Sequence, residues 1–300
     1  MIDYPEANDI LELNLPQAKA SSLWTQAWKK MRSNRFAIIG LIILGLLIFI
    51  AIAAPWIAPH DPLELNLRDA LQPPGSPNHI LGTDELGRDT LSRLIYGSRI
   101  SLSVGIIVVF IAGSIGVILG AISGYFGGII DQIIMRLVDV LLAFPFLILA
   151  IAVVSIVGSS LTNVMITLGM VSWISYARLV RSMVLSLREE EFVTAAKVIG
   201  VKDWKIIFRH ILPNTLGIVI VQATFGAATA ILSAAALSFL GMGAQPPTAE
   251  WGAMLSTAKQ NMRQQPILAI APGLAIMITV LAINFVGDAL RDALDPRIRS

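Results

Sequence analysis

Five long stretches of this sequence contain no Asp, Glu, Lys or Arg, and they constrain the fold more than any other feature. These uncharged stretches are residues 36–59, 100–130, 140–177, 211–249 and 264–287. A helix that crosses a bilayer needs about 20 mostly apolar residues, and each stretch is long enough. Charged residues make up 14% of the chain, whereas soluble domains carry about 25%. The sequence therefore predicts an all-α, multi-pass membrane protein and excludes a free soluble enzyme.

The number of spans follows from how these stretches divide. The third stretch is too long for one span, and Gly158 to Ser160 break it near the middle. The fourth has glycines and prolines crowded into its second half, so we expect one span followed by a return loop. Whether residues 235–265 of that loop include a membrane-embedded helix stays open. We predict six transmembrane helices, at residues 36–57, 100–122, 137–157, 161–180, 214–235 and 267–287.

The placement of Lys and Arg predicts the orientation. With six spans, most basic residues fall on the side that carries both termini, so we expect the N- and C-termini to be cytoplasmic. The predicted organisation has four parts: a flexible tail at 1–20, an interfacial helix plus the first span at 21–57, an extracytoplasmic segment at 58–98 and a core transmembrane domain at 99–300. In the interfacial helix, Trp24, Trp28 and Met31 share one face.

The extracytoplasmic segment begins as a proline-rich loop. Asp89 or Thr90 is placed to cap a short helix after it. His60 and His79 lie 19 positions apart in the sequence without acidic ligands in register, so we expect solvated loop histidines and no metal site.

The cytoplasmic loop 188–213 is the most informative soluble piece. Phe192, Ala195, Ala196 and Ile199 recur at helical spacing and predict one apolar stripe on a short helix. Gly200 is placed to end that helix, and Asp203 to cap a second one bearing Trp204, Ile207, Phe208 and Ile211. The stripe suits docking into a partner, but periodicity equally allows it to fold back on its own bundle.

Small and polar residues inside the spans suggest how the helices pack. Gly116, Gly120 and Gly124 form a ladder typical of close helix contact, most simply within this chain. Ala223, Gly226 and Ala230 have similar spacing in the fifth span and are candidates for a pathway or a subunit contact. Asp139 is the one acidic residue near a span interior, and we expect an interfacial ion pair with Arg136. Pro145 and Pro272 are positioned to kink their spans.

Several kinds of chemistry are absent. The chain has no cysteine, no Gly-Lys-Ser/Thr phosphate loop and no His-Glu-x-x-His motif. A membrane protein without an energy source or proton-relay residues is either passive or driven by a partner.

The loop then points to a family. Ala195-Ala196-x-x-x-Gly200, followed by Leu212-Pro213, resembles the Glu-Ala-Ala (EAA) loop of ABC-importer permeases, although Thr194 replaces the Glu and His210 an Ile. Segments 81–93, 238–255 and 287–296 look like the C-type permease of dipeptide/oligopeptide importers. The resemblance covers residues 22–300.

The resemblance implies a type I ABC-importer permease fold in the bacterial inner membrane. It implies a heterodimer with a B-type permease, two ABC ATPase subunits that bind ATP and Mg, and an extracytoplasmic peptide-binding protein. This chain would bind no cofactor or nucleic acid and would not itself be an enzyme. The expected ATPase-coupling residues are Glu191, Phe192, Ala195, Ala196, Ile199, Gly200, Leu212 and Pro213.

Three functions stay open on sequence alone: a peptide-importer subunit, the same machine with nickel or glutathione as cargo, and a self-contained carrier. The last would require buried charges or an inverted repeat, which the sequence lacks. We expect Ala195→Glu, or an Ala196→Glu and Gly200→Pro pair, to block transport and leave the chain in the membrane.

Overall fold

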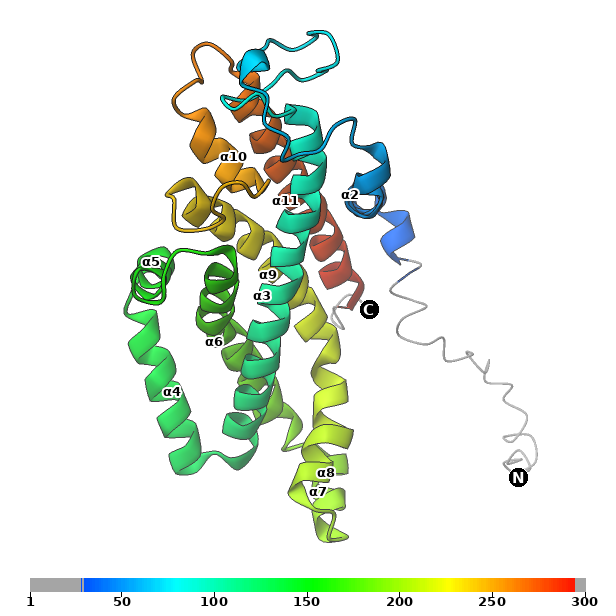
Figure 1. Ribbon diagram of the computed structural model, residues 1–300. Helices are drawn as coiled ribbons and strands as arrows, with labels where there is room; N and C mark the ends of the chain where they lie inside the picture. Colours follow the sequence, from blue (N-terminus) through cyan, green and yellow to red (C-terminus); the bar gives the residue numbers. More distant parts are fainter. Residues whose placement is uncertain (1–27, 29, 295–300) are drawn as a thin grey trace, which may run out of the picture.

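A computed structural model describes Trp28 and residues 30–294, and within that part of the chain every regular element is a helix. Five helices are long and apolar enough to cross a membrane. They are α2 (Arg35–Ile57), α3 (Thr90–Phe126), α6 (Leu161–Leu187), a continuous helix from Asp203 to Phe239, and α11 (Ile267–Leu294). A sixth span exists if the bent pair α4 (Gly128–Leu142) and α5 (Phe146–Val157) counts as one (Figure 1). The helical, six-span prediction is confirmed in this form.

The third span is not the single helix at 137–157 that we expected. α4 begins at Gly128, and α4 and α5 meet at 92°. Pro145 lies at the break, where it lacks an N–H for helical bonding and disfavours helical geometry in the preceding residue. The expected kink is therefore a sharp break. Pro272, in contrast, lies inside α11 without ending it.

The second span is longer than expected at both ends. Asp89 is the N-cap, and its carboxylate accepts the Ser92 N–H at 2.7 Å. From Thr90 the chain is helical to Phe126, so the short helix predicted before residue 98 and the span predicted at 100–122 are one element. Gly97 lies inside this helix, and the ring of Trp251 packs where a Cβ at this position would stand.

The glycine ladder of α3 packs against α6 within this chain, as predicted. A Cβ on Gly116 would lie 2.5 Å from the carbonyl oxygen of Trp173, and one on Gly120 would lie 2.5 Å from that of Ala177. At Gly124 the nearest atom would be the Arg181 carbonyl oxygen, at 2.9 Å. Because these neighbours are backbone atoms, α3 and α6 approach closely only with glycine at these positions.

The fifth span is also longer than 214–235, because it continues from the segment before it. α8 (Asp203–Lys205) leads into a π-helical turn, η2 (Ile206–Ile211), and then into α9 (Leu212–Phe239). Pro213 lies in the first turn of α9, as expected. Proline has no N–H, and the wider turn, in which Leu212 N–H bonds to Ile207, carries the helix past it.

The first described residues pack against the C-terminal helix. Trp28 and residues 30–33 are helical, but Trp24 and the predicted tail at 1–20 lie outside the described residues. Met31 is buried in a cluster with Ala37 of α2 and Leu290 of α11, whereas Trp28 is 53% exposed. The two side chains therefore do not share one exposed face.

The return loop contains one short helix. α10 (Trp251–Ala258) is capped by Glu250, whose carboxylate accepts the N–H groups of Gly252 and Ala253 at 2.9 and 2.8 Å. Trp251 is 1% exposed and donates its ring N–H to the Leu94 carbonyl at 3.0 Å. α10 thereby joins α3 to α9 and α11.

We expect the two obvious substitutions of Glu250 to have different effects. Burial raises the pKa of this carboxyl, and the two N–H groups lower it only in part. The folded chain therefore binds this proton more tightly than the unfolded chain, and the stability contribution falls as pH rises from the unfolded pKa through the folded one. Glu250→Gln keeps a capping oxygen and removes this pH dependence, whereas Glu250→Ala loses the cap and about 1 kcal/mol.

Thermal unfolding of the detergent-solubilised chain from pH 5 to pH 8 measures both effects. Equal stability of the Gln and Ala variants at every pH would contradict the capping role.

Candidate functional site

The segment between α6 and α9 contains the residues that the sequence singles out. α7 (Glu191–Val198) has Glu191 in its first turn and Lys197 in its last, both favourable for the helix dipole. The Gly200 N–H bonds to Lys197 and the Val201 N–H to Ala196, each at 3.0 Å. This is a Schellman motif, and Gly200 has the positive φ of 78° that it requires. The predicted end of the helix is confirmed.

The predicted apolar stripe divides between two sides of α7. Ala196 is 6% exposed and packs with Val193 against the side chains of α3 and α6. Phe192 and Ile199 point away from the bundle and are 42% and 78% exposed, and Ala195 is exposed as well. α7 therefore has one apolar side that is exposed and an opposite side that packs back onto the bundle. Ala196 belongs to the side that folds back, and Val193, which the predicted stripe omits, lies there with it.

The next turns repeat this division. Ile207 and Ile211 are 6% and 0% exposed and belong to the same buried cluster as Val193. Trp204 and Phe208 are 58% and 61% exposed. Helical spacing grouped the four on one face, but the π-turn and the docked position of this segment separate them into two pairs.

Tyr125, at the end of α3, ties this segment to the bundle. Its hydroxyl donates to the Asp203 carboxylate at 2.6 Å. The Lys197 ammonium lies 5.1 Å from the centre of its ring. Asp203 is therefore not the predicted N-cap, which is Lys202; it accepts from Tyr125 instead. One side chain thus contacts both α7 and the start of α8.

The exposed apolar side chains of this segment are not explained by lipid. Most exposed Ile and Phe on the spans lie in uncharged stretches, where the bilayer covers them; Ile133 on α4 is an exception. In contrast, residues 188–209 include many charged side chains. We call the exposed apolar set of this segment the docking surface; it comprises Phe192, Ala195, Val198, Ile199, Trp204 and Phe208. Such a surface in a polar environment is a candidate protein contact.

Of the other predicted coupling residues, Glu191 and Gly200 are exposed beside the docking surface. Leu212 is half-buried against the cluster of Val193, and Pro213 is exposed. Leu212 and Pro213 therefore continue the helix behind the docking surface instead of enlarging it.

The four candidate pathway residues are divided between α4, which carries Asp139, and α9, which carries Ala223, Gly226 and Ala230. Asp139 is exposed on α4, and among the described residues it forms no ion pair with Arg136. Gly226 packs against Tyr176 of α6, because a Cβ there would lie 2.4 Å from the Tyr176 hydroxyl. Ala230 is 4% exposed inside the core, and Ala223 is half-buried.

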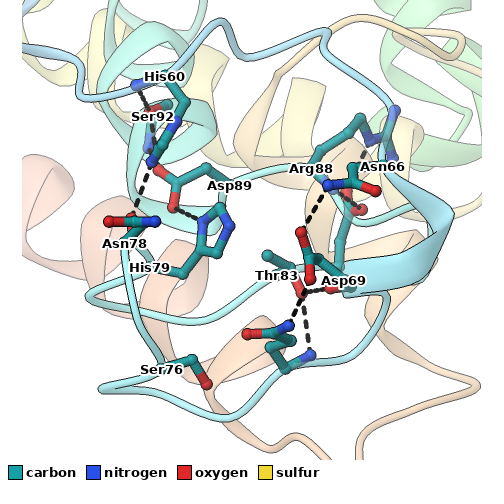
Figure 2. A network of polar contacts seen from close by, with 12 residues as sticks. His60, Asn66, Asp69, Ser76, Asn78, His79, Thr83, Arg88, Asp89 and Ser92 are labelled. Atoms are coloured by element: carbon teal, nitrogen blue, oxygen red, sulfur yellow. Dashed lines mark hydrogen bonds and ion pairs between the residues drawn. The ribbon is translucent and has the colours of Figure 1, made fainter.

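At the opposite end of the molecule, the segment 58–89 forms a compact polar network that sequence reasoning missed (Figures 1 and 2). Arg88 is 2% exposed and donates to the Asp84 carboxylate at 2.7 Å, and Arg93 lies 3.4 Å from the same group. Gly82 and Gly87 have positive φ, and a Cβ on Gly87 would lie 1.8 Å from the Asn66 carbonyl oxygen. In the sequence, the closely spaced glycines within 82–93 were the signal from which a tightly folded loop could have been predicted.

His60 and His79 lie in this network and are not simply solvated. Their rings are 4.8 Å apart between centres, and His79 Nδ1 lies 2.9 Å from the Asp89 carboxylate. Both side chains are half-buried, and Asp89 is 2% exposed. The expectation of solvated histidines is wrong because the loop folds back onto the start of α3.

The chain shares its sequence with transport proteins over nearly its whole length. Residues 116–300 match the family described as binding-protein-dependent transport system inner membrane component. Residues 22–74 match the N-terminal transmembrane domain of oligopeptide transport permease C. A dipeptide transport system permease protein of Alkalihalophilus pseudofirmus is 50% identical over 284 residues, which is 95% of this chain and 93% of the relative.

Two further comparisons agree. A glutathione transport system permease protein of Escherichia coli is 48% identical over 276 residues, covering 92% of this chain and 91% of the relative. A solved chain of the MetNI methionine ABC transporter, in an inward-facing conformation, has a TM-score of 0.54 at 20% identity and covers 68% of this chain and 96% of that chain. That structure shows a shared fold. The chain belongs to the family of binding-protein-dependent transport system inner membrane components, and it is a multi-pass protein of the inner membrane.

Proposed function

We propose that this chain is one transmembrane subunit of an ATP-driven importer, and that it forms the translocation pathway for di- and oligopeptides together with a B-type permease. The observation that carries the proposal is the docking surface, an exposed apolar set on a charged segment of a chain from this family. In this proposal the chain is not an enzyme. ATP and Mg are bound by two partner ATPases, and a binding protein delivers the substrate.

In this proposal, the docking surface is the part of the chain that contacts the ATPase and is moved by it. Phe192 and Ile199 enter a groove of the ATPase, while Val193 and Ala196 hold α7 against α3 and α6. When ATP closes the ATPase pair, α7 moves with its groove, and the packed helices behind it turn the pathway outward. The permease can shift only as far as ATP binding favours one state over the other.

The orientation belongs to the same proposal. The end that carries α7 faces the cytoplasm with both termini, and the segment 58–98 faces outward towards the binding protein. We also propose the division that the sequence predicts: a tail at 1–20, an interfacial helix with the first span at 21–57, and a core at 99–300. The path itself is proposed to run along α9 on the side of Ala223.

Peptides are the cargo that the comparisons favour. A relative at 50% identity is named for dipeptides and one at 48% for glutathione, which is itself a tripeptide. Glutathione is therefore the second candidate, and nickel is a third that no relative named here supports. In this proposal the binding protein largely sets the selectivity. The sequence identity of the permease therefore supports peptides as a class of cargo and does not single out one peptide.

Two measurements test this function. The tagged chain is purified from gently solubilised native membranes, and we expect a second permease and P-loop ATPases to co-purify. Uptake of a labelled dipeptide is then compared with that of glutathione and of nickel, in cells with and without the chain. A folded chain that purifies alone and still carries out uptake would overturn the proposal in favour of a self-contained carrier.

A further inference from the structure

Three potential metal ligands from separate turns of the segment 58–89 meet in its polar network. His60 follows the end of α2, His79 lies in the loop, and Asp89 caps α3 (Figure 2). One ligand atom from each of the three lies within 4.8 Å of the other two. In the described part of the chain, this is the one group of three or more His, Asp or Glu side chains that comes so close.

The three residues are held in place by hydrogen bonds behind them. Ser92 is fully buried; its hydroxyl donates to the Asp89 carboxylate at 2.7 Å and accepts the backbone N–H of His60 at 3.0 Å. The Ser92 N–H donates to the same carboxylate oxygen, at 2.7 Å. The His79 N–H bonds to the Ser76 carbonyl at 3.0 Å, which closes the turn that carries the second histidine. Outer partners of this kind orient the ligands of metal sites.

We propose that His60, His79 and Asp89 bind a divalent transition metal of the zinc class. Two imidazole nitrogens and one carboxylate oxygen are a donor set that zinc takes readily, and they leave a fourth position open. Calcium and magnesium instead prefer oxygen donors throughout. The proposal concerns the outer segment of this chain and does not depend on the cargo of the transporter.

The distances require only a small adjustment. Ligand bonds of about 2.1 Å in a tetrahedral site place neighbouring donors about 3.4 Å apart. His79 Nδ1 and the Asp89 oxygen, at 2.9 Å, would have to separate slightly, while the more distant atoms, within 4.8 Å, would have to move inward. His60 Nε2 now bonds to the Asn78 carbonyl at 2.8 Å, and it would exchange this bond for the metal or present Nδ1.

The site also has an entrance. His60 lines an open cavity of about 640 Å³ together with Asp61, Tyr96 and Thr248. A hydrated cation can therefore approach the cluster from the side of His60, whereas His79 and Asp89 do not line this cavity. Once bound, the metal would fasten the end of α2 to the start of α3, two elements otherwise joined there through Ser92.

Zinc binding by the purified full-length chain tests the proposal. The chain carries a tag without histidine, is stripped with a chelator in detergent, and is titrated with zinc chloride. We expect one zinc per chain by elemental analysis and a melting temperature that rises with zinc concentration. Magnesium and calcium should produce neither effect.

Matched variants locate the site. His60→Ala, His79→Ala and Asp89→Asn should each weaken zinc binding by about 100-fold or more, and Asn keeps an oxygen for the Ser92 N–H. His210→Ala is the control, because His210 lies on the π-turn at the other end of the molecule and should leave binding unchanged. Variant melting temperatures without zinc show whether each variant has folded.

Two results would overturn the proposal: no stoichiometric zinc bound by the wild-type chain, or equal binding by the wild-type chain and a folded His60→Ala, His79→Ala double variant.

Discussion

Ala195→Glu should abolish transport while the chain stays folded in the membrane, whereas Ala196→Glu should destabilise the chain itself. The two residues are neighbours and receive the same charge, but Ala195 is exposed on the docking surface and Ala196 is 6% exposed in the cluster of Val193 and Ile207. A carboxylate forced into an apolar contact costs about 3 kcal/mol, which weakens ATPase docking about a hundredfold. The sequence alone led us to expect that Ala195→Glu, or Ala196→Glu together with Gly200→Pro, would leave the chain in the membrane, and the buried position of Ala196 changes this expectation for the pair.

The measurement compares three quantities for each variant: the amount of chain in the membrane, its melting temperature, and peptide uptake with the ATPase rate of the assembled complex. For Ala195→Glu, we expect wild-type amount and stability with uncoupled ATPase activity. Normal coupling in that variant would refute the docking role of Ala195. A stable, abundant Ala196→Glu variant would show that Ala196 is not buried against the bundle.

Gly120→Ala should unfold or severely weaken the bundle, whereas Gly113→Ala should be tolerated. A Cβ on Gly120 would lie 2.5 Å from the carbonyl oxygen of Ala177, a backbone atom that moves only if α3 and α6 separate. The nearest atom to a Cβ on Gly113 would be a ring carbon of Tyr176 at 3.8 Å, an ordinary contact. We expect a loss of about 3 kcal/mol at Gly120, and at Gly113 either no change or a small gain from the higher helix propensity of alanine.

Thermal unfolding in detergent, with expression level as a second readout, distinguishes the two variants. Because both add one methyl group to the same helix, any general effect of alanine on α3 cancels between them. Equal stability of the two variants would show that α3 and α6 do not approach as closely as described.

The spans were predictable because charge inside a bilayer is costly, so the uncharged stretches mark them directly. The glycine ladder was predictable for a similar reason, since spacing alone places Gly116, Gly120 and Gly124 on one side of a helix. The 92° break at Pro145 was anticipated only as a kink. A proline indicates where a helix is weak, but neighbouring helices decide the angle.

The candidate site was less predictable, for two physical reasons. Periodicity identifies an amphipathic helix, but it does not say which part of an apolar stripe faces the bundle, as Ala195 and Ala196 show. The meeting of His60, His79 and Asp89 depends on how a long loop closes, and no local pattern encodes that closure. Tyr125 was missed because its partner Asp203 comes from a segment far away in the sequence.

The length of α3 has a mechanical consequence. Its 37 residues span about 55 Å, whereas the hydrocarbon core is about 30 Å thick, so the helix extends well beyond it. It is capped by Asp89, in the polar network of segment 58–89, and its last turn contains Tyr125, which bonds to Asp203 beside the docking surface. A helix does not shorten, so a tilt of α3 about a point inside the membrane would move Asp89 one way and Tyr125 the other. The two ends of the bundle would then share one moving part.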